Sequence, residues 1–178
     1  MRWEPEEFDD LAAELRRRVA AEFRSEAEEV ERLVQLQRRR SATLRDVATT
    51  AMHQGHRATV HFLESNWSGE LLAVGSDYLS LLTRTHFVEA RLDSIAIALS
   101  PAREGGRTGK PASATFRARL TEFELTGEEL TLRCRSPLIE ASGVIEVVAT
   151  DHVEVRLATE RCYLPFDGVV MAIRSRPE

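Results

Sequence analysis

The feature that most constrains the fold of this chain is an internal repeat. Residues 69–98 and 143–172 carry the same pattern of glycine, aspartate and alternating hydrophobic residues, 74 positions apart throughout (143 − 69 = 74). Large apolar residues alternate with polar ones between these markers, and a period of two is typical of half-buried strands. The chain is therefore predicted to contain two copies of one small β-module. The identical markers are Gly69 and Gly143, Asp77 and Asp151, and Asp93 and Asp167.

Each copy is predicted to be a short helix followed by five strands. In the first copy, Thr43 to Asp46 form a capping-box pattern, and apolar residues follow at helical spacing until Gly55 ends the helix. In the second copy a helix is expected over 116–125, and two extra residues are expected in the first hairpin, near 136–141. The strands expected in the first copy are 58–63, 69–74, 78–83, 87–92 and 94–99, with a turn at 66–69 between the first two.

Four segments follow from this pattern. Residues 1–40 form a charged amphipathic helix, 41–100 the first module, 101–112 a flexible linker and 113–178 the second module. The linker assignment depends on three glycines and two prolines in the stretch PAREGGRTGKP. The expected fold class is thus α+β and mainly β.

The N-terminal helix carries a narrow apolar stripe between dense glutamate and arginine residues. Its period is close to 11/3 residues per turn, which is nearer to a straight helix than to a strict heptad. A helix this charged gains little by lying alone in water, so self-association through a helical pair or bundle is favoured over packing on the chain's own modules. The stripe consists of Phe8, Leu11, Leu15, Val19, Phe23, Ala27 and Val30.

Composition excludes several classes of function. The net charge of −5 argues against a general polyanion binder, although Arg38, Arg39 and Arg40 leave a local basic patch possible. No apolar run is long enough to span a membrane and no export signal is recognised, so a cytoplasmic location is expected. Cys134 and Cys162 are expected to be free thiols, and no metal site, cofactor or catalytic motif is predicted.

The modules resemble the Sm-like fold, a small and strongly bent β-barrel. The segments that carry the resemblance are GELLAVGSDYLSLL and VEARLDSIAIAL in the first copy, and GVIEVVATDHVEVRL and CYLPFDGVVMAI in the second. The resemblance implies two tandem Sm-like five-stranded barrels, RNA binding, and assembly by pairing of the fourth and fifth strands. Two barrels in one chain could pair strand four of one with strand five of the other.

The leading functional hypothesis is a non-enzymatic interaction or scaffold protein that self-associates or binds a protein partner. The turns between the fourth and fifth strands carry Asp93 and Asp167, and a carboxylate there repels phosphate. The alternative is an RNA-binding regulator of the Sm-like type, in which exposed rings after the bend stack on bases. The candidate contact residues for a partner or nucleic acid are Trp67, Tyr78, His152, Arg38, Arg39 and Arg40, with the apolar segment 137–139 as a further contact surface.

Overall fold

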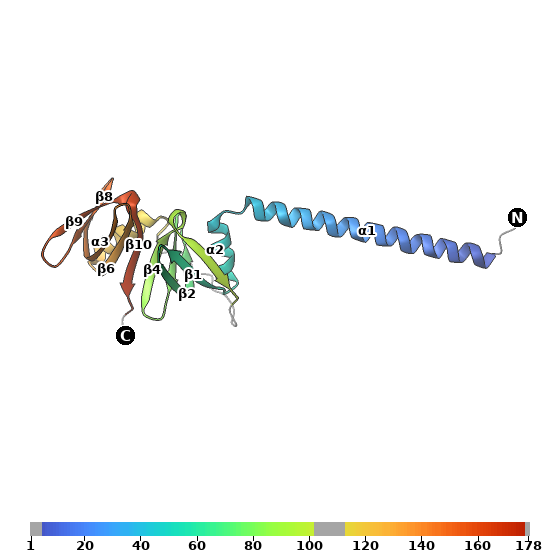
Figure 1. Ribbon diagram of the computed structural model, residues 1–178, viewed down its shortest axis with the longest axis horizontal. Coiled ribbons are helices and arrows are strands. Elements are labelled where there is room, and N and C mark those ends of the chain that lie inside the picture. Colours follow the sequence, from blue (N-terminus) through green and yellow to red (C-terminus); the bar gives the residue numbers. More distant parts are fainter. Residues whose placement is uncertain (1–4, 102–112, 177–178) are drawn as a thin grey trace. The chain divides into compact units, whose positions relative to one another are not determined.

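The computed structural model describes residues 5–101 and 113–176, with side chains in the first helix from residue 14 onward (Figure 1). The chain divides into two compact units, Met1–Ala42 and Thr43–Glu178. The first unit contains one helix, and the second contains all of the described strands. The fold class is therefore α+β and mainly β, as predicted. The segment predicted to be a flexible linker lies almost entirely outside the described residues.

Helix α1 is continuous from Pro5 to Ser41, a length of 37 residues. Its last turn carries Arg38, Arg39 and Arg40, where positive charge offsets the negative end of the helix dipole. The apolar side chains in the described part of the helix are exposed, including Leu15 at 55% and Phe23 at 68%. The predicted long helix is confirmed, and within its own unit the described part of its apolar stripe, from Leu15 onward, is exposed.

The second unit repeats the order of one helix and five strands. Short 3₁₀ turns, Leu92–Ser94 and Phe166–Gly168, precede the fifth strand of each copy. The first copy consists of α2 (Leu44–His53), β1 (Arg57–Phe62), β2 (Ser65–Val74), β3 (Tyr78–Leu82), β4 (His86–Arg91) and β5 (Ala96–Ser100). The second consists of α3 (Phe116–Thr126), β6 (Glu129–Arg135), β7 (Leu138–Val148), β8 (His152–Arg156), β9 (Arg161–Pro165) and β10 (Val169–Ser175).

All ten strands join in one antiparallel sheet with the order β5-β1-β2-β3-β4-β10-β6-β7-β8-β9. The two copies meet where β4 pairs with β10, which places Ala90 opposite Met171 and Val88 opposite Ile173. This is the predicted pairing of strand four of one copy with strand five of the other. Within the described residues the sheet does not close on itself, since β5 and β9 lie at the two ends of the order. The two closed five-stranded barrels expected from the resemblance are therefore not seen there.

Strand β10 contributes to both hydrophobic cores. Met171 and Ile173 pack in the core of the first copy with Val88 and other residues of β1–β4. Val169 and Ala172 point the other way, into the core of the second copy. Alternation separates Ala172 from Met171 and Ile173, and the register shift between Val169 and Met171 places Val169 on the same side as Ala172, so one strand completes two cores.

The repeated glycines mark sites where two backbones come close together. A Cβ atom on Gly69 would lie 2.1 Å from the carbonyl oxygen of Leu82, and one on Gly143 would lie 2.1 Å from that of Arg156. Both glycines precede a register shift in the long second strand of their copy, at Leu71/Ala73 and Ile145/Val147. The glycine repeat therefore reflects a close approach of neighbouring strands, which only glycine allows.

The expected turn at 66–69 is wrong. Strand β1 pairs with β2 from Phe62 and Ser65, so the turn is Leu63–Glu64, and Leu63 takes a positive φ of 51°. The polar composition of 66–69 favoured a turn, but pairing across the hairpin keeps these residues in the strand. The expected helix of the second copy is confirmed as α3, and the extra residues of its hairpin lie around Ser136–Pro137.

Candidate functional site

The most elaborate polar site in the described residues is the junction between the two copies. Helix α3 packs mainly on β7 of its own copy and also contacts β4 of the first copy, and its Phe116 meets Tyr78 of β3. The backbone N–H of Phe116 donates to Oδ1 of Asp77 at 2.7 Å, and the hydroxyl of Tyr78 donates to the carbonyl of Ser113 at 3.0 Å. The start of α3 is thereby anchored on the bend that precedes β3.

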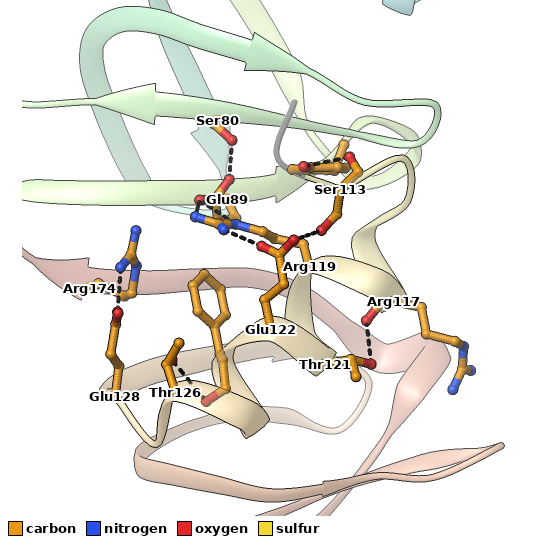
Figure 2. Close-up of polar contacts among 12 residues, drawn as sticks. Ser80, Glu89, Ser113, Arg117, Arg119, Thr121, Glu122, Thr126, Glu128 and Arg174 are labelled. Atoms are coloured by element: carbon orange, nitrogen blue, oxygen red, sulfur yellow. Dashed lines mark hydrogen bonds and ion pairs between the residues drawn. The ribbon is translucent and has the colours of Figure 1, made fainter. Parts of the chain in front are cut away.

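A network of charged and polar side chains extends this contact (Figure 2). Glu89 of β4 is 2% exposed, and its Oε1 accepts from Nη2 of Arg119 at 2.9 Å. The same guanidinium binds Glu122, whose carboxylate also accepts from the hydroxyl of Ser113. The hydroxyl of Ser80 donates to the second oxygen of Glu89. Every group in this chain of contacts has a partner, which is the condition under which buried charge is tolerated.

The electrostatics of the junction follow from burial and pairing. Burial raises the pKa of Tyr78, and the nearby charge of Glu89 adds to the rise. Burial acts to lower the pKa of Arg119, but its bonds and charge interactions with Glu89 and Glu122 outweigh that effect and raise it. For Glu122, burial acts to raise the pKa, but the bonds from Ser113 and Arg119 lower it overall. These shifts favour the ionised forms of Arg119 and Glu122, and their contacts with Glu89 and Ser113 hold α3 against β4.

No protein-family model and no curated protein sequence matches this chain. Its function must therefore be derived from its own surfaces. In the described part of the chain, no group of three or more His, Cys, Asp or Glu side chains is placed to hold a metal ion. None of the helices described there has an apolar stretch sufficient to cross a bilayer.

The two residues predicted to follow the bend have different surroundings. Tyr78 is fully buried, and its ring lies 6.2 Å from that of Phe116, so the expectation of an exposed ring at Tyr78 is wrong. The reason is that α3 covers this face of the first copy. His152, the matching residue in the second copy, is partly exposed and lies beside Asp151 and Tyr163.

Trp67 lies within β2, and it is partly buried rather than placed at a hairpin tip. Its ring packs against the guanidinium of Arg133 in the second copy at 5.0 Å and meets the edge of His86 at 6.2 Å. Arg133 also donates to the hydroxyl of Ser65 at 2.6 Å. Trp67 therefore contacts the other copy of the same chain through a cation–π interaction with Arg133, as well as its own copy through His86.

The remaining predicted contacts are accessible. Arg38, Arg39 and Arg40 are exposed in the last turn of α1. In the 137–139 segment, Leu138 and Ile139 are exposed and line an open groove of about 590 Å³ together with Leu63. The two cysteines are free, and burial with a contribution from Cys162 raises the pKa of Cys134 to about 11.

Sequence reasoning missed Glu89 and Arg119 as the centre of the junction. Side chains alternate along β4, so Glu89 lies on the face opposite Val88 and Ala90. A charged residue on that face indicates exposure to solvent. Its partner lies 30 residues along the chain. The available signal was that the second-copy counterpart of Glu89 in the repeat is Tyr163, a change from a charged to an aromatic residue.

Proposed function

We propose that this protein is a non-enzymatic scaffold that self-associates through α1 and presents a tandem pair of Sm-like modules. The observation that carries the proposal is the exposed apolar stripe of α1, which includes Leu15, Val19 and Phe23. Burial of such side chains contributes about 1.5–3 kcal/mol each. A second copy of the same helix supplies a matching apolar stripe with glutamate and arginine on both flanks.

The strand order supports the Sm-like assignment of the modules. Within each copy the fifth strand pairs with the first, and the first four pair in succession, as in β5-β1-β2-β3-β4. Each copy also has its own cluster of buried side chains beside a short capping helix. The β4–β10 ladder joins the two copies into one sheet, so the proposed scaffold would present both modules as a single unit.

RNA binding is the second candidate. It retains Arg38, Arg39 and Arg40 as exposed cations and His152 as a partly exposed ring. It loses Tyr78 as a stacking residue, because that ring is buried under α3. For this reason we rank it below the scaffold function.

The test replaces Leu15 and Val19 by glutamate in the full chain. Two charges placed in the stripe should prevent association of the helices. The mass measured by sedimentation velocity should therefore be smaller than that of the unaltered chain. The matched control is Ala21→Glu with Gln35→Glu, which adds the same charge on the opposite face of the helix and should leave the mass unchanged. An unchanged mass in the Leu15 and Val19 variant would refute self-association through α1.

A further inference from the structure

The charged residues around α1 are grouped in blocks of one sign that alternate along the sequence. The first acidic block, 4–10, contains five acidic residues and no basic ones, and the first basic block, 16–18, consists of three arginines. The second acidic block, 26–31, contains four glutamates and no basic residue, and the second basic block, 38–40, is again three arginines. The side chains of the last three blocks are exposed. Any helix that covers the apolar stripe of α1 would therefore also meet these charges.

The blocks distinguish the two orientations in which a pair of α1 helices can align. In a parallel pair in register, each block lies beside its own copy, so all four contacts are between like charges. In an antiparallel pair, the first basic block lies beside the second acidic block, and the first acidic block lies beside the second basic block. Charges that flank paired helices select their orientation, because like charges repel and opposite charges attract. The order of the blocks therefore favours the antiparallel pair.

The apolar stripe fits the same alignment. When two antiparallel copies of α1 are centred near Phe23, Leu15 of one helix lies opposite Val30 of the other. These two side chains are 55% and 60% exposed in the single chain. The same alignment brings Arg17, the centre of the first basic block, level with Glu28 in the second acidic block. The stripe and the charges thus lead independently to one register.

We propose that α1 pairs with α1 of a second copy in the antiparallel orientation, so that the sheets of the two chains follow opposite ends of the pair. This inference rests on the self-association proposed above and adds its orientation. Helix α1 has 37 residues, and at a rise of 1.5 Å per residue it is about 55 Å long. Each sheet follows the C-terminal end of its own helix in the sequence. The paired scaffold would therefore bridge two partners at a distance, whereas a parallel pair would bring them together.

A parallel pair shifted by one block would also bring opposite charges together. It would leave one block of each helix without a partner, and these free ends could bind further chains in an open series. The antiparallel pair has two-fold symmetry, so every block has a partner and the assembly closes. Two-fold dimers are also the commonest homo-oligomers. The antiparallel pair is therefore favoured over the shifted parallel pair.

Disulfide cross-linking tests the orientation in the full chain. Leu15→Cys and Val30→Cys are made as separate variants, mixed in equal amounts and oxidised with diamide. The antiparallel pair should give a disulfide between residue 15 of one chain and residue 30 of the other. Peptide mapping by mass spectrometry identifies this bond and separates it from any bond of Cys134 or Cys162. Each variant oxidised alone should give little cross-linked dimer, because its two new cysteines lie far apart in the antiparallel pair.

Charge reversal tests the role of the blocks. The first basic block is reversed by R16E, R17E and R18E, so an antiparallel pair would bring acidic blocks together on both sides. We expect association, measured by sedimentation velocity, to weaken by about tenfold or more. Reversing the second acidic block in the same chain, by E28R, E29R and E31R, should restore it.

A matched control changes the net charge equally outside α1. The substitutions R57E, R84E and R176E are at exposed positions, and they should leave association unchanged. Circular dichroism verifies that each variant keeps its helix content.

Three results would overturn the antiparallel orientation. One is a disulfide between residue 15 of both chains, and another is association that does not change when the first basic block is reversed. The third is a stronger cross-link between residues 19 and 30, made with Val19→Cys, than between residues 15 and 30. All three leave self-association through α1 intact, which separates this inference from the proposed function. If the unaltered chain is monomeric at every concentration, both fail.

Discussion

At the scale of single residues, the junction depends on a buried charge whose partner comes from the other copy. Glu89 lies among apolar residues of β4, and Arg119 and Ser80 satisfy both of its oxygens. Pairing offsets the cost of removing both charges from water, but it leaves little net gain. The pair fixes the position of α3 on β4, because α3 can contact β4 in only one place without leaving a charge unpaired.

Glu89→Gln should therefore destabilise the second unit. The variant leaves Arg119 largely buried with Glu122 as its remaining anionic partner, and we expect the free energy of unfolding to fall by about 3 kcal/mol. Urea denaturation followed by circular dichroism measures this change. Glu160→Gln, at an exposed position, is the control and should change stability by less than about 0.5 kcal/mol. If the two variants lose the same free energy of unfolding, the ion pair between Glu89 and Arg119 does not stabilise the junction.

At the scale of elements, the repeat predicted most of the secondary structure. Alternating hydrophobic residues placed the strands to within a few residues, and the capping pattern at Thr43 and Asp46 is present as hydrogen bonds in both directions. The turn at Leu63 was missed because a leucine with positive φ carries no turn signal. The burial of Tyr78 was missed because it depends on a helix that follows in the second copy, which periodicity within one strand cannot reveal.

The close approach of β8 to Gly143 of β7 leads to a separate prediction. A methyl group there would overlap the carbonyl of Arg156, which belongs to backbone and cannot rotate away. Gly143→Ala should cost about 1–3 kcal/mol of stability in urea denaturation. Leu138→Ala, at an exposed position on the same strand, should cost much less. If the two variants are equally stable, the strands do not approach as closely as the structure describes.

At the scale of the whole molecule, the shared sheet couples the two copies of the second unit. Each core contains residues of the other copy, Met171 in the first and Tyr78 in the second. Loss of one core would therefore expose apolar surface of the other. We expect the two copies to unfold together in a single transition.

The fluorescence of Trp67 can test this coupling, because it lies in the first copy. In a Trp3→Phe background it is the chain's single tryptophan. Leu120→Ala in the second core should lower the midpoint seen by Trp67 as much as the midpoint seen by circular dichroism, with a cost of about 2–5 kcal/mol. Leu81→Ala, in the first core, is the matched comparison. Two separate midpoints would mean that the copies unfold independently.

The double role of β10 also has a consequence for synthesis. Val169 to Ser175 complete both cores, and the ribosome makes them after every other strand of this unit. Domains usually fold in order as they emerge, the first before the second. Here the first copy lacks Met171 and Ile173 until translation of the unit is finished. The nascent first copy therefore exposes part of its hydrophobic core during synthesis, and chaperones bind such exposed apolar surface.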